Sequence, residues 1–312
     1  MPRSLAHEIL SAIASSAQRS RLHFADRADD SERDFELGSF DSVQVAGPID
    51  VVIHTGSPSK VQANGPEWAL ENLRVDVEGD RLFIGCDGDC DAVSVVVKVP
   101  DLRALRMSGS GDVSVDRAAG ERFECASSGS GDLAVGSVEA EEFRMSASGS
   151  GDVRIDEVRG TGVDVRIMGS GDLRIGGMEG STFGLTMNGS GDAEIGEYCG
   201  DRMEASLTGS GDLALDSLES AAIKLALFGS GDVRIGGGKA KTAAFETSGS
   251  GDIDAESMSV KEASISVMGS GDISAEVSGR AEITVMGSGD VSISGGAKCT
   301  ISGSGSGEVR CS

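Results

Sequence analysis

The sequence predicts an all-β protein built as a parallel β-solenoid with about 20 residues per turn and a short N-terminal helix. Three observations lead to this prediction. The tetrapeptide Gly-Ser-Gly-Asp occurs ten times and is followed by one Gly-Ser-Gly-Glu, the copies are almost evenly spaced, and apolar and polar residues alternate between them. A chain with 46 glycines is either disordered or rich in tight turns, and the even spacing favours turns.

The spacing of the tetrapeptide defines the length of one turn. Most steps are of 20 residues and the last two are of 18, with copies starting at Gly109, Gly129, Gly149, Gly169, Gly189, Gly209, Gly229, Gly249, Gly269, Gly287 and Gly305. We interpret each Gly-Ser-Gly as a corner, because glycine adopts positive φ without steric cost and lets neighbouring backbones approach closely.

Hydrophobic periodicity places two short strands in each repeat. The residues one and three places after each Asp are mostly apolar, as Val153 and Ile155 are, and so are those six, four and two places before each corner, as Val163, Val165 and Ile167 are. The residues between them are largely polar, so each strand has one buried face.

A seven-residue loop, such as Asp116–Arg122, completes each repeat. Its midpoint is often apolar, which predicts a third inward-facing side, at Val138, Val158, Met178, Tyr198, Leu218 and Met258. An antiparallel meander would also accommodate two strands per 20 residues, but it does not require identical corners. A solenoid stacks each residue on its counterpart about 4.8 Å away and does require them, so we favour the solenoid.

The chain divides into three parts on these grounds. Residues 107–312 form the repeat solenoid, and residues 34–106 read as short β-strands that open it, with a hairpin turn at Glu78–Asp80. Residues 1–33 form a helical or flexible segment, in which Leu5, Ile9 and Ile13 stand at helical spacing. We expect this helix to be either a cap of the solenoid or an oligomer contact.

The net charge of −24 restricts the partners. A strongly acidic surface repels nucleic acid and anionic membranes, and suits multivalent cations or basic partners. Solubility alone would also account for it. No apolar run approaches the roughly 20 residues of a membrane span, and the N-terminus is a poor match to a signal peptide, which leaves a cytoplasmic location open.

The aspartates of the repeats are the candidate metal ligands. They form one column, Asp112, Asp132, Asp152, Asp172, Asp192, Asp212, Asp232, Asp252, Asp272 and Asp290, ending in Glu308. Full charges stacked about 4.8 Å apart repel by about 0.9 kcal/mol per pair in water and about 3.5 kcal/mol at an effective dielectric constant of 20. Backbone N–H groups, splayed side chains, partial protonation or bound cations such as Ca²⁺ must offset this repulsion. We favour a structural role in the turn over a metal site.

A second acidic feature lies between Cys86 and Cys90, which can form a disulfide in an oxidising compartment. Asp87, Asp89 and Asp91 alternate as in a calcium-binding loop, but the glycine and glutamate of such a loop are missing. We therefore expect a solvated turn.

The column directly before each corner points outward by parity. It contains Met168, Phe228, Met268 and Met286 among small polar residues. Exposed apolar residues in one stripe can mark a contact with a partner or a second copy, or they can tuck under the corner. Both alternatives stay open.

Catalysis has little support in the sequence. The three histidines precede the repeats, one Trp and one Tyr leave little to stack on sugar rings, and carboxylate pairs are present in every two turns and so carry no information. A β-helix carbohydrate enzyme is therefore the least favoured alternative.

Together, these features resemble the family described as putative auto-transporter adhesin, head GIN domain. The resemblance covers about residues 34–312 and includes the strands Phe40–Gly47, Ile49–Ile53 and Leu82–Ile84, and the run Val95–Val113 that leads into the first corner. It implies a right-handed parallel β-helix, usually exported to a bacterial cell envelope, with an ill-defined molecular function and no catalytic residues. The implied function is non-catalytic, adhesin-like binding of a protein or glycan, with a calcium-stabilised surface scaffold as the alternative.

Overall fold

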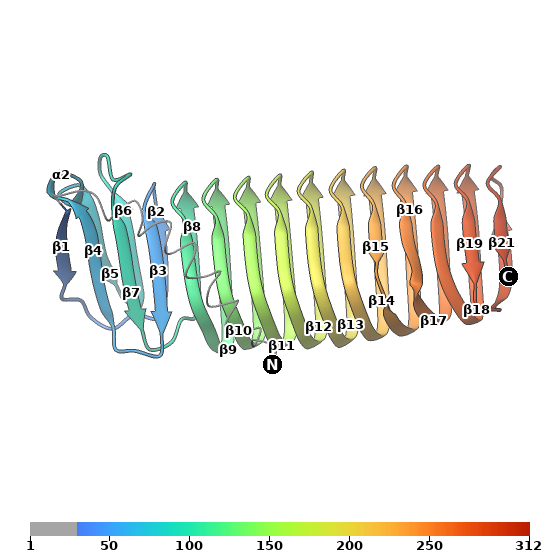
Figure 1. Ribbon diagram of the computed structural model, residues 1–312, viewed down its shortest axis with the longest axis horizontal. Coiled ribbons are helices and arrows are strands. Elements are labelled where there is room, and N and C mark those ends of the chain that lie inside the picture. The colour runs from blue at the N-terminus through green and yellow to red at the C-terminus, as the bar shows by residue number, and fades with distance from the viewer. Residues whose placement is uncertain (1–29) are drawn as a thin grey trace, which may run out of the picture.

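The computed structural model describes residues 30–312, which form one elongated stack of strands (Figure 1). Residues 30–108, called the cap below, lie at one end of the stack, and the last repeat lies at the other. The predicted N-terminal helix lies outside the described residues. None of the helices among residues 30–312 is long and apolar enough to cross a membrane.

Strands account for about three quarters of the described chain. Before the repeats they are β1 (Asp30–Phe35), β2 (Ser42–Ala46), β3 (Asp50–Thr55), β4 (Lys60–Pro66), β5 (Leu73–Glu78), β6 (Arg81–Cys86), β7 (Ser94–Val99) and β8 (Ala104–Gly109), with the short helix α2 (Glu67–Leu70) after β4. The repeats contain β9 (Val113–Gly129), β10 (Leu133–Gly149), β11 (Val153–Gly169), β12 (Leu173–Gly189), β13 (Ala193–Gly209), β14 (Leu213–Gly229), β15 (Val233–Ile235), β16 (Gly238–Gly249), β17 (Ile253–Gly269), β18 (Ile273–Gly287), β19 (Val291–Ser294), β20 (Lys298–Gly303) and β21 (Val309–Cys311).

The repeats form a parallel β-solenoid, as predicted. Each strand pairs in parallel with its counterpart one turn along, and Leu133 in β10 lies opposite Val153 in β11. The expectation of two short strands and a loop per repeat is wrong for most turns, because one 17-residue strand runs from corner to corner. The reason is that pairing continues through the outer bend, where Val138 lies opposite Val158.

The core is a set of inward-facing columns that run the length of the stack. The predicted third side is confirmed, since the midpoint residues are buried: Val138, Val158, Met178, Tyr198, Leu218 and Met258. One inward column changes its side chains along the stack. It begins with Phe123 and Phe143, whose rings stack at 5.6 Å, contains Ala243, Ala263 and Ala281 in the later turns, and ends with Cys299.

The corners show why both glycines are needed. Gly169 has a φ of +135°, and a Cβ on it would lie 2.1 Å from the carbonyl oxygen of Gly149 in the previous turn. A Cβ on Gly171 would lie 2.2 Å from the carbonyl oxygen of Gly151. Only glycine therefore allows this spacing of the turns.

Residues 30–108 form a cap with a different topology. The pair β2–β3 lies between β6–β7 on one side and β8–β9 on the other, so chain order and spatial order differ. Strand β4 pairs antiparallel with β7, and β1 pairs antiparallel with β4. Strands β5 and β6 form the predicted hairpin, with Glu78 opposite Arg81. The first strand begins at Asp30, within the segment 1–33 that the sequence assigns to the N-terminal region.

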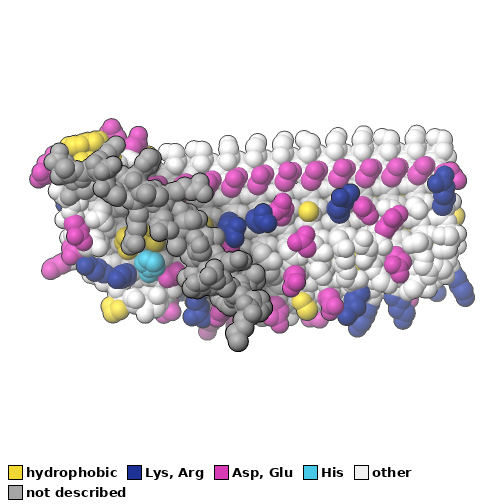
Figure 2. Space-filling view, in the orientation of Figure 1, with side chains coloured by type: hydrophobic (Ala, Val, Ile, Leu, Met, Phe, Trp, Pro, Cys, Tyr) yellow, Lys and Arg dark blue, Asp and Glu magenta, His cyan; other side chains and the backbone are white. Residues whose placement is uncertain are grey.

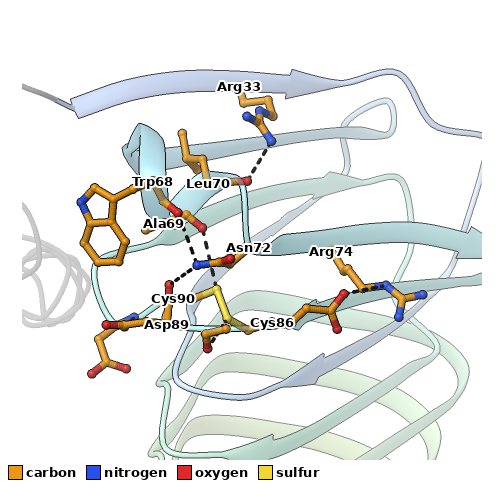
Figure 3. Close-up of a disulfide and its surroundings, with 12 residues drawn as sticks. Arg33, Trp68, Ala69, Leu70, Asn72, Arg74, Cys86, Asp89 and Cys90 are labelled. Atoms are coloured by element: carbon orange, nitrogen blue, oxygen red, sulfur yellow. Dashed lines mark hydrogen bonds and ion pairs between the residues drawn. A yellow bond between two sulfur atoms is a disulfide. The ribbon is translucent and has the colours of Figure 1, made fainter.

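The cap is closed around α2 by a small polar network (Figure 3). The side-chain amide of Asn72 donates to the carbonyl oxygens of Trp68 at 3.3 Å and Asp89 at 3.2 Å, beside the Cys86–Cys90 disulfide. Arg33 of β1 donates to the carbonyl oxygen of Leu70 at 2.8 Å. The bonds to Trp68 and Leu70 satisfy carbonyl groups that a short helix leaves unpaired, and the bond to Asp89 ties the disulfide loop to the helix.

Candidate functional surface

The aspartate column is a continuous ladder on one edge of the solenoid, visible as a row of acidic side chains (Figure 2). In each turn one carboxylate oxygen accepts a hydrogen bond from the backbone N–H of the aspartate in the next turn. Asp152, for example, accepts from the N–H of Asp172 at 2.9 Å, and the distances along the ladder range from 2.7 to 3.0 Å. Of the four ways of offsetting the charge repulsion, the structure therefore shows backbone hydrogen bonding.

The ladder is longer than the repeat motif indicates. Asp50 accepts the N–H of Asp112 at 3.0 Å, so Gly47-Pro48-Ile49-Asp50 forms a corner equivalent to Gly-Ser-Gly-Asp. Its only sequence signal is the Gly-x-x-Asp spacing. At the other end Glu308 accepts from Arg310 at 2.8 and 3.0 Å, and this hydrogen bond, with the charge of the guanidinium, lowers the pKa of Glu308.

The described residues contain no group of three or more His, Cys, Asp or Glu side chains placed to hold a metal ion. In the ladder one oxygen of each aspartate is used in the bond to the next turn, and cation binding through the other oxygen stays a prediction. In the acidic turn, Asp89 accepts the backbone N–H of Asp91 at 3.2 Å, as in an ordinary Asx turn.

A shallow groove of about 530 Å³ follows the ladder along the first turns. The aspartates form one side, and the outward residues two places after them form the other, among them Ser114, Ala134, Arg154 and Arg174. The arginines are paired with acids, Arg154 with Asp156 at 2.9 Å and Arg174 with Glu194 at 2.7 Å. The groove therefore presents unpaired carboxylate oxygens beside small and ion-paired side chains.

The stripe before the corners points outward, as parity predicts. Met168 and Met286 are each 47% exposed and Phe228 is 38% exposed, whereas Met268 is half-buried. These side chains are too far apart along the stack to form one patch, apart from Met268 and Met286, which lie on neighbouring turns. A contact between copies through this stripe stays a prediction.

The cysteines fall into two groups. Cys86–Cys90 is bridged, as the sequence allows, and so is Cys299–Cys311, a pair that no spacing signal in the sequence indicates. The second bridge lies in the last turn, where Cys299 follows Ala281 and Cys311 follows Ile293 in two inward columns. Cys125 and Cys199 are free, and burial raises the pKa of the Cys125 thiol to about 12.

The histidine nearest to the repeats joins the cap to the first turn. Nδ1 of His54 lies 3.2 Å from Asp116, which also accepts the backbone N–H of Thr55 at 3.0 Å and its hydroxyl at 3.2 Å. The threonine hydroxyl is bonded to the carboxylate rather than to the imidazole, so the three residues lack the order of a nucleophile–base–acid relay.

Solved structures of similar proteins come from Parabacteroides species. One is a putative adhesin from Parabacteroides merdae, 15% identical, with a TM-score of 0.46, matching 92% of this chain and 97% of that one. Another putative adhesin, from Parabacteroides distasonis, is 17% identical, with a TM-score of 0.45 and coverage of 91% and 97%. A putative lipid binding protein from Parabacteroides distasonis is 18% identical, with a TM-score of 0.43 and coverage of 92% and 98%. No curated protein matches the sequence.

A family model matches the sequence over residues 39–198 and 196–297. The match therefore includes the cap strands β2–β8 as well as the repeats, in agreement with the resemblance noted in the sequence. With most of its length matched, the chain belongs to the family described as putative auto-transporter adhesin, head GIN domain.

Proposed function

We propose that this protein is a non-catalytic, adhesin-like binding protein that presents the aspartate ladder to a basic surface partner. The observation that carries the proposal is the ladder itself. Hydrogen bonds from turn to turn hold a straight row of exposed carboxylates, each with one oxygen left for a ligand. A rigid row loses little conformational entropy on binding, which favours recognition of an extended partner.

The family and the neighbouring structures support a binding role over a catalytic one, since they are described as adhesins or a lipid binding protein. The two disulfides support a location in an oxidising compartment, such as a bacterial cell envelope. Fractionation of native cells, followed by blotting, tests the location, and recovery of the protein from the cytoplasm would contradict it.

Binding to an oligolysine peptide, measured by surface plasmon resonance at about 0.15 M salt, tests the ladder at a salt concentration where only near charges act strongly. The test variant replaces four ladder residues by asparagine, at Asp152, Asp172, Asp192 and Asp212. The control variant replaces four acids away from the ladder by glutamine, at Glu139, Glu141, Glu142 and Glu157, and so changes the net charge by the same amount.

We expect the ladder variant to bind at least several-fold more weakly than the control. Equal weakening would mean that net charge, and not the ladder, attracts basic ligands. Turnover of any member of a polysaccharide panel by the purified chain would favour the enzyme alternative.

A further inference from the structure

A row of exposed cations stands on the outer bend of the last four turns. Each turn contributes one, in the order Lys241, Lys261, Arg280 and Lys298. Among the described residues none of the four makes an ion pair, whereas most other cations of the repeats do. In a chain with a net charge of −24, four neighbouring unpaired cations are an unusual concentration of positive charge. We call these four residues the cationic ridge.

Strand register places the ridge residues in two adjacent columns on this bend: Arg280 and Lys298 share one column, and Lys241 and Lys261 stand one residue before it. Glu262 of β17 lies opposite Arg280 of β18, and Arg280 lies opposite Lys298 of β20. Lys261 precedes Glu262, and Lys241 occupies the same place one turn earlier. Glu262 shares this edge and leaves the ridge with a net positive charge.

The ridge and the ladder lie on different edges of the solenoid. Figure 2 shows the row of acidic side chains along the upper edge and Lys and Arg side chains projecting from the lower edge of the C-terminal half. Both rows contribute one charge per turn, and turns are about 4.8 Å apart, although the ridge shifts by one residue between Lys261 and Arg280. A second copy displaced sideways, with its axis parallel, would bring its ladder alongside the ridge with the turns level.

We infer that the cationic ridge binds the aspartate ladder of a second copy, so that solenoids associate side by side. The occupant is a second copy because two copies of one chain share the same turn spacing, which an unrelated anionic polymer matches only by chance. The contact joins two different surfaces, and repetition of it gives an open row of parallel solenoids instead of a closed dimer. This inference is independent of the proposed function, although it uses the same ladder.

The association is expected to be weak and short-ranged. Exposed ion pairs contribute little individually, and the net charge of each copy opposes the approach. At about 0.15 M salt the screening length is about 8 Å, so the level rows act on each other while the rest of each molecule is screened. Association should therefore rise with protein concentration at this salt and disappear at about 1 M salt, where the screening length is about 3 Å.

Sedimentation velocity of the full chain over a series of concentrations tests the inference. One charge-swap variant carries Lys261→Glu and Arg280→Glu, and the other carries Asp252→Lys and Asp272→Lys. We expect each variant alone to lose at least tenfold in association constant, and an equimolar mixture of the two to recover association. A control with Arg144→Glu and Arg166→Glu, two cations that are already ion-paired and lie several turns from the ridge, should associate like the wild type.

Circular dichroism checks that each variant folds. If Asp252→Lys with Asp272→Lys does not fold, Asp252→Asn with Asp272→Asn should still weaken association. A monomer at every concentration, or a mixture that does not recover association, would overturn the inference. Binding of an acidic polysaccharide to the ridge without self-association would overturn it too, by naming a different occupant.

Discussion

The cap and the repeats differ in strand direction and in the role of their glycines. In the repeats every turn is a near copy of the last, its strands are parallel, and its corner is built from glycines that no other residue can replace. In the cap, three strands run antiparallel to their neighbours, and exposed glycines such as Gly38 have open space around them. Two features of the repeats, the corner and the carboxylate, nevertheless appear in the cap at Gly47–Asp50.

The difference shows what a repeat array requires at its start. A turn of a solenoid gains its pairing and its core from the turns on either side. The cap supplies the first such surface with β2–β3, which pairs with β8–β9 on the repeat side and is covered by β6–β7 on the other. The antiparallel strands β4 and β1 then form an edge that no longer has the repeat's pattern, and β1 carries four charged residues out of six, which protects an edge from further pairing.

The largest expected effect separates the glycines of the two regions. Gly169→Ala should lower the free energy of unfolding by about 3 kcal/mol, because it adds backbone strain and steric overlap of about 1–3 kcal/mol each. The matched change in the cap, Gly38→Ala, should alter it by less than about 0.5 kcal/mol. Urea unfolding followed by circular dichroism measures both. Equal effects would mean that the corners are looser than the structure indicates.

Removal of each disulfide compares how much it stabilises its own end of the molecule. Replacing Cys299 and Cys311 by serine should cost about 3 kcal/mol, and replacing Cys86 and Cys90 about 2 kcal/mol, because the longer loop restricts the unfolded chain more. Guanidinium unfolding without reductant gives both values.

Alkylation checks the pairing that this comparison assumes. Iodoacetamide at pH 8 should label the native protein once, at the exposed Cys199, because the pKa of buried Cys125 is raised to about 12 and its thiol stays protonated. Peptide mass spectrometry locates the label. Labelling of Cys299 or Cys311 without reductant would show that the second bridge is not formed.

A smaller effect tests whether the cap corner is a true member of the ladder. Asp172→Ala should lower the free energy of unfolding by about 1 kcal/mol through loss of one hydrogen bond, and Asp172→Asn by less than about 0.5 kcal/mol, because the amide oxygen can still accept it. Asp50→Ala should cost as much as Asp172→Ala. A negligible effect at Asp50 would mean that the cap meets the repeats through its strands alone.

The smallest expected effect concerns calcium. Since backbone N–H groups already bind each carboxylate, we expect the same midpoint of thermal unfolding with calcium as with a chelator. A calcium-dependent rise would instead support the calcium-stabilised scaffold, because a ligand that binds only the folded state raises its stability.

The sequence by itself determined the repeat region almost completely. Its period fixes the length of a turn, and its alternation fixes which side chains, such as Val153 and Ile155, face the core. This works because each residue's neighbours are its own counterparts one turn away, so a local pattern also describes the tertiary contacts. The prediction of a loop at the outer bend is wrong, because pairing between turns keeps the chain in strand conformation there.

Only the tertiary structure decided the contacts between unlike segments. It places β2–β3 between strands that follow them in the chain, adds Asp50 to the ladder, joins Cys299 to Cys311 in the last turn, and brings Lys261 and Arg280 to the same bend of neighbouring turns. None of these has a repeating signal. They depend on the distances between segments that are remote in the sequence, and packing of the whole stack sets those distances.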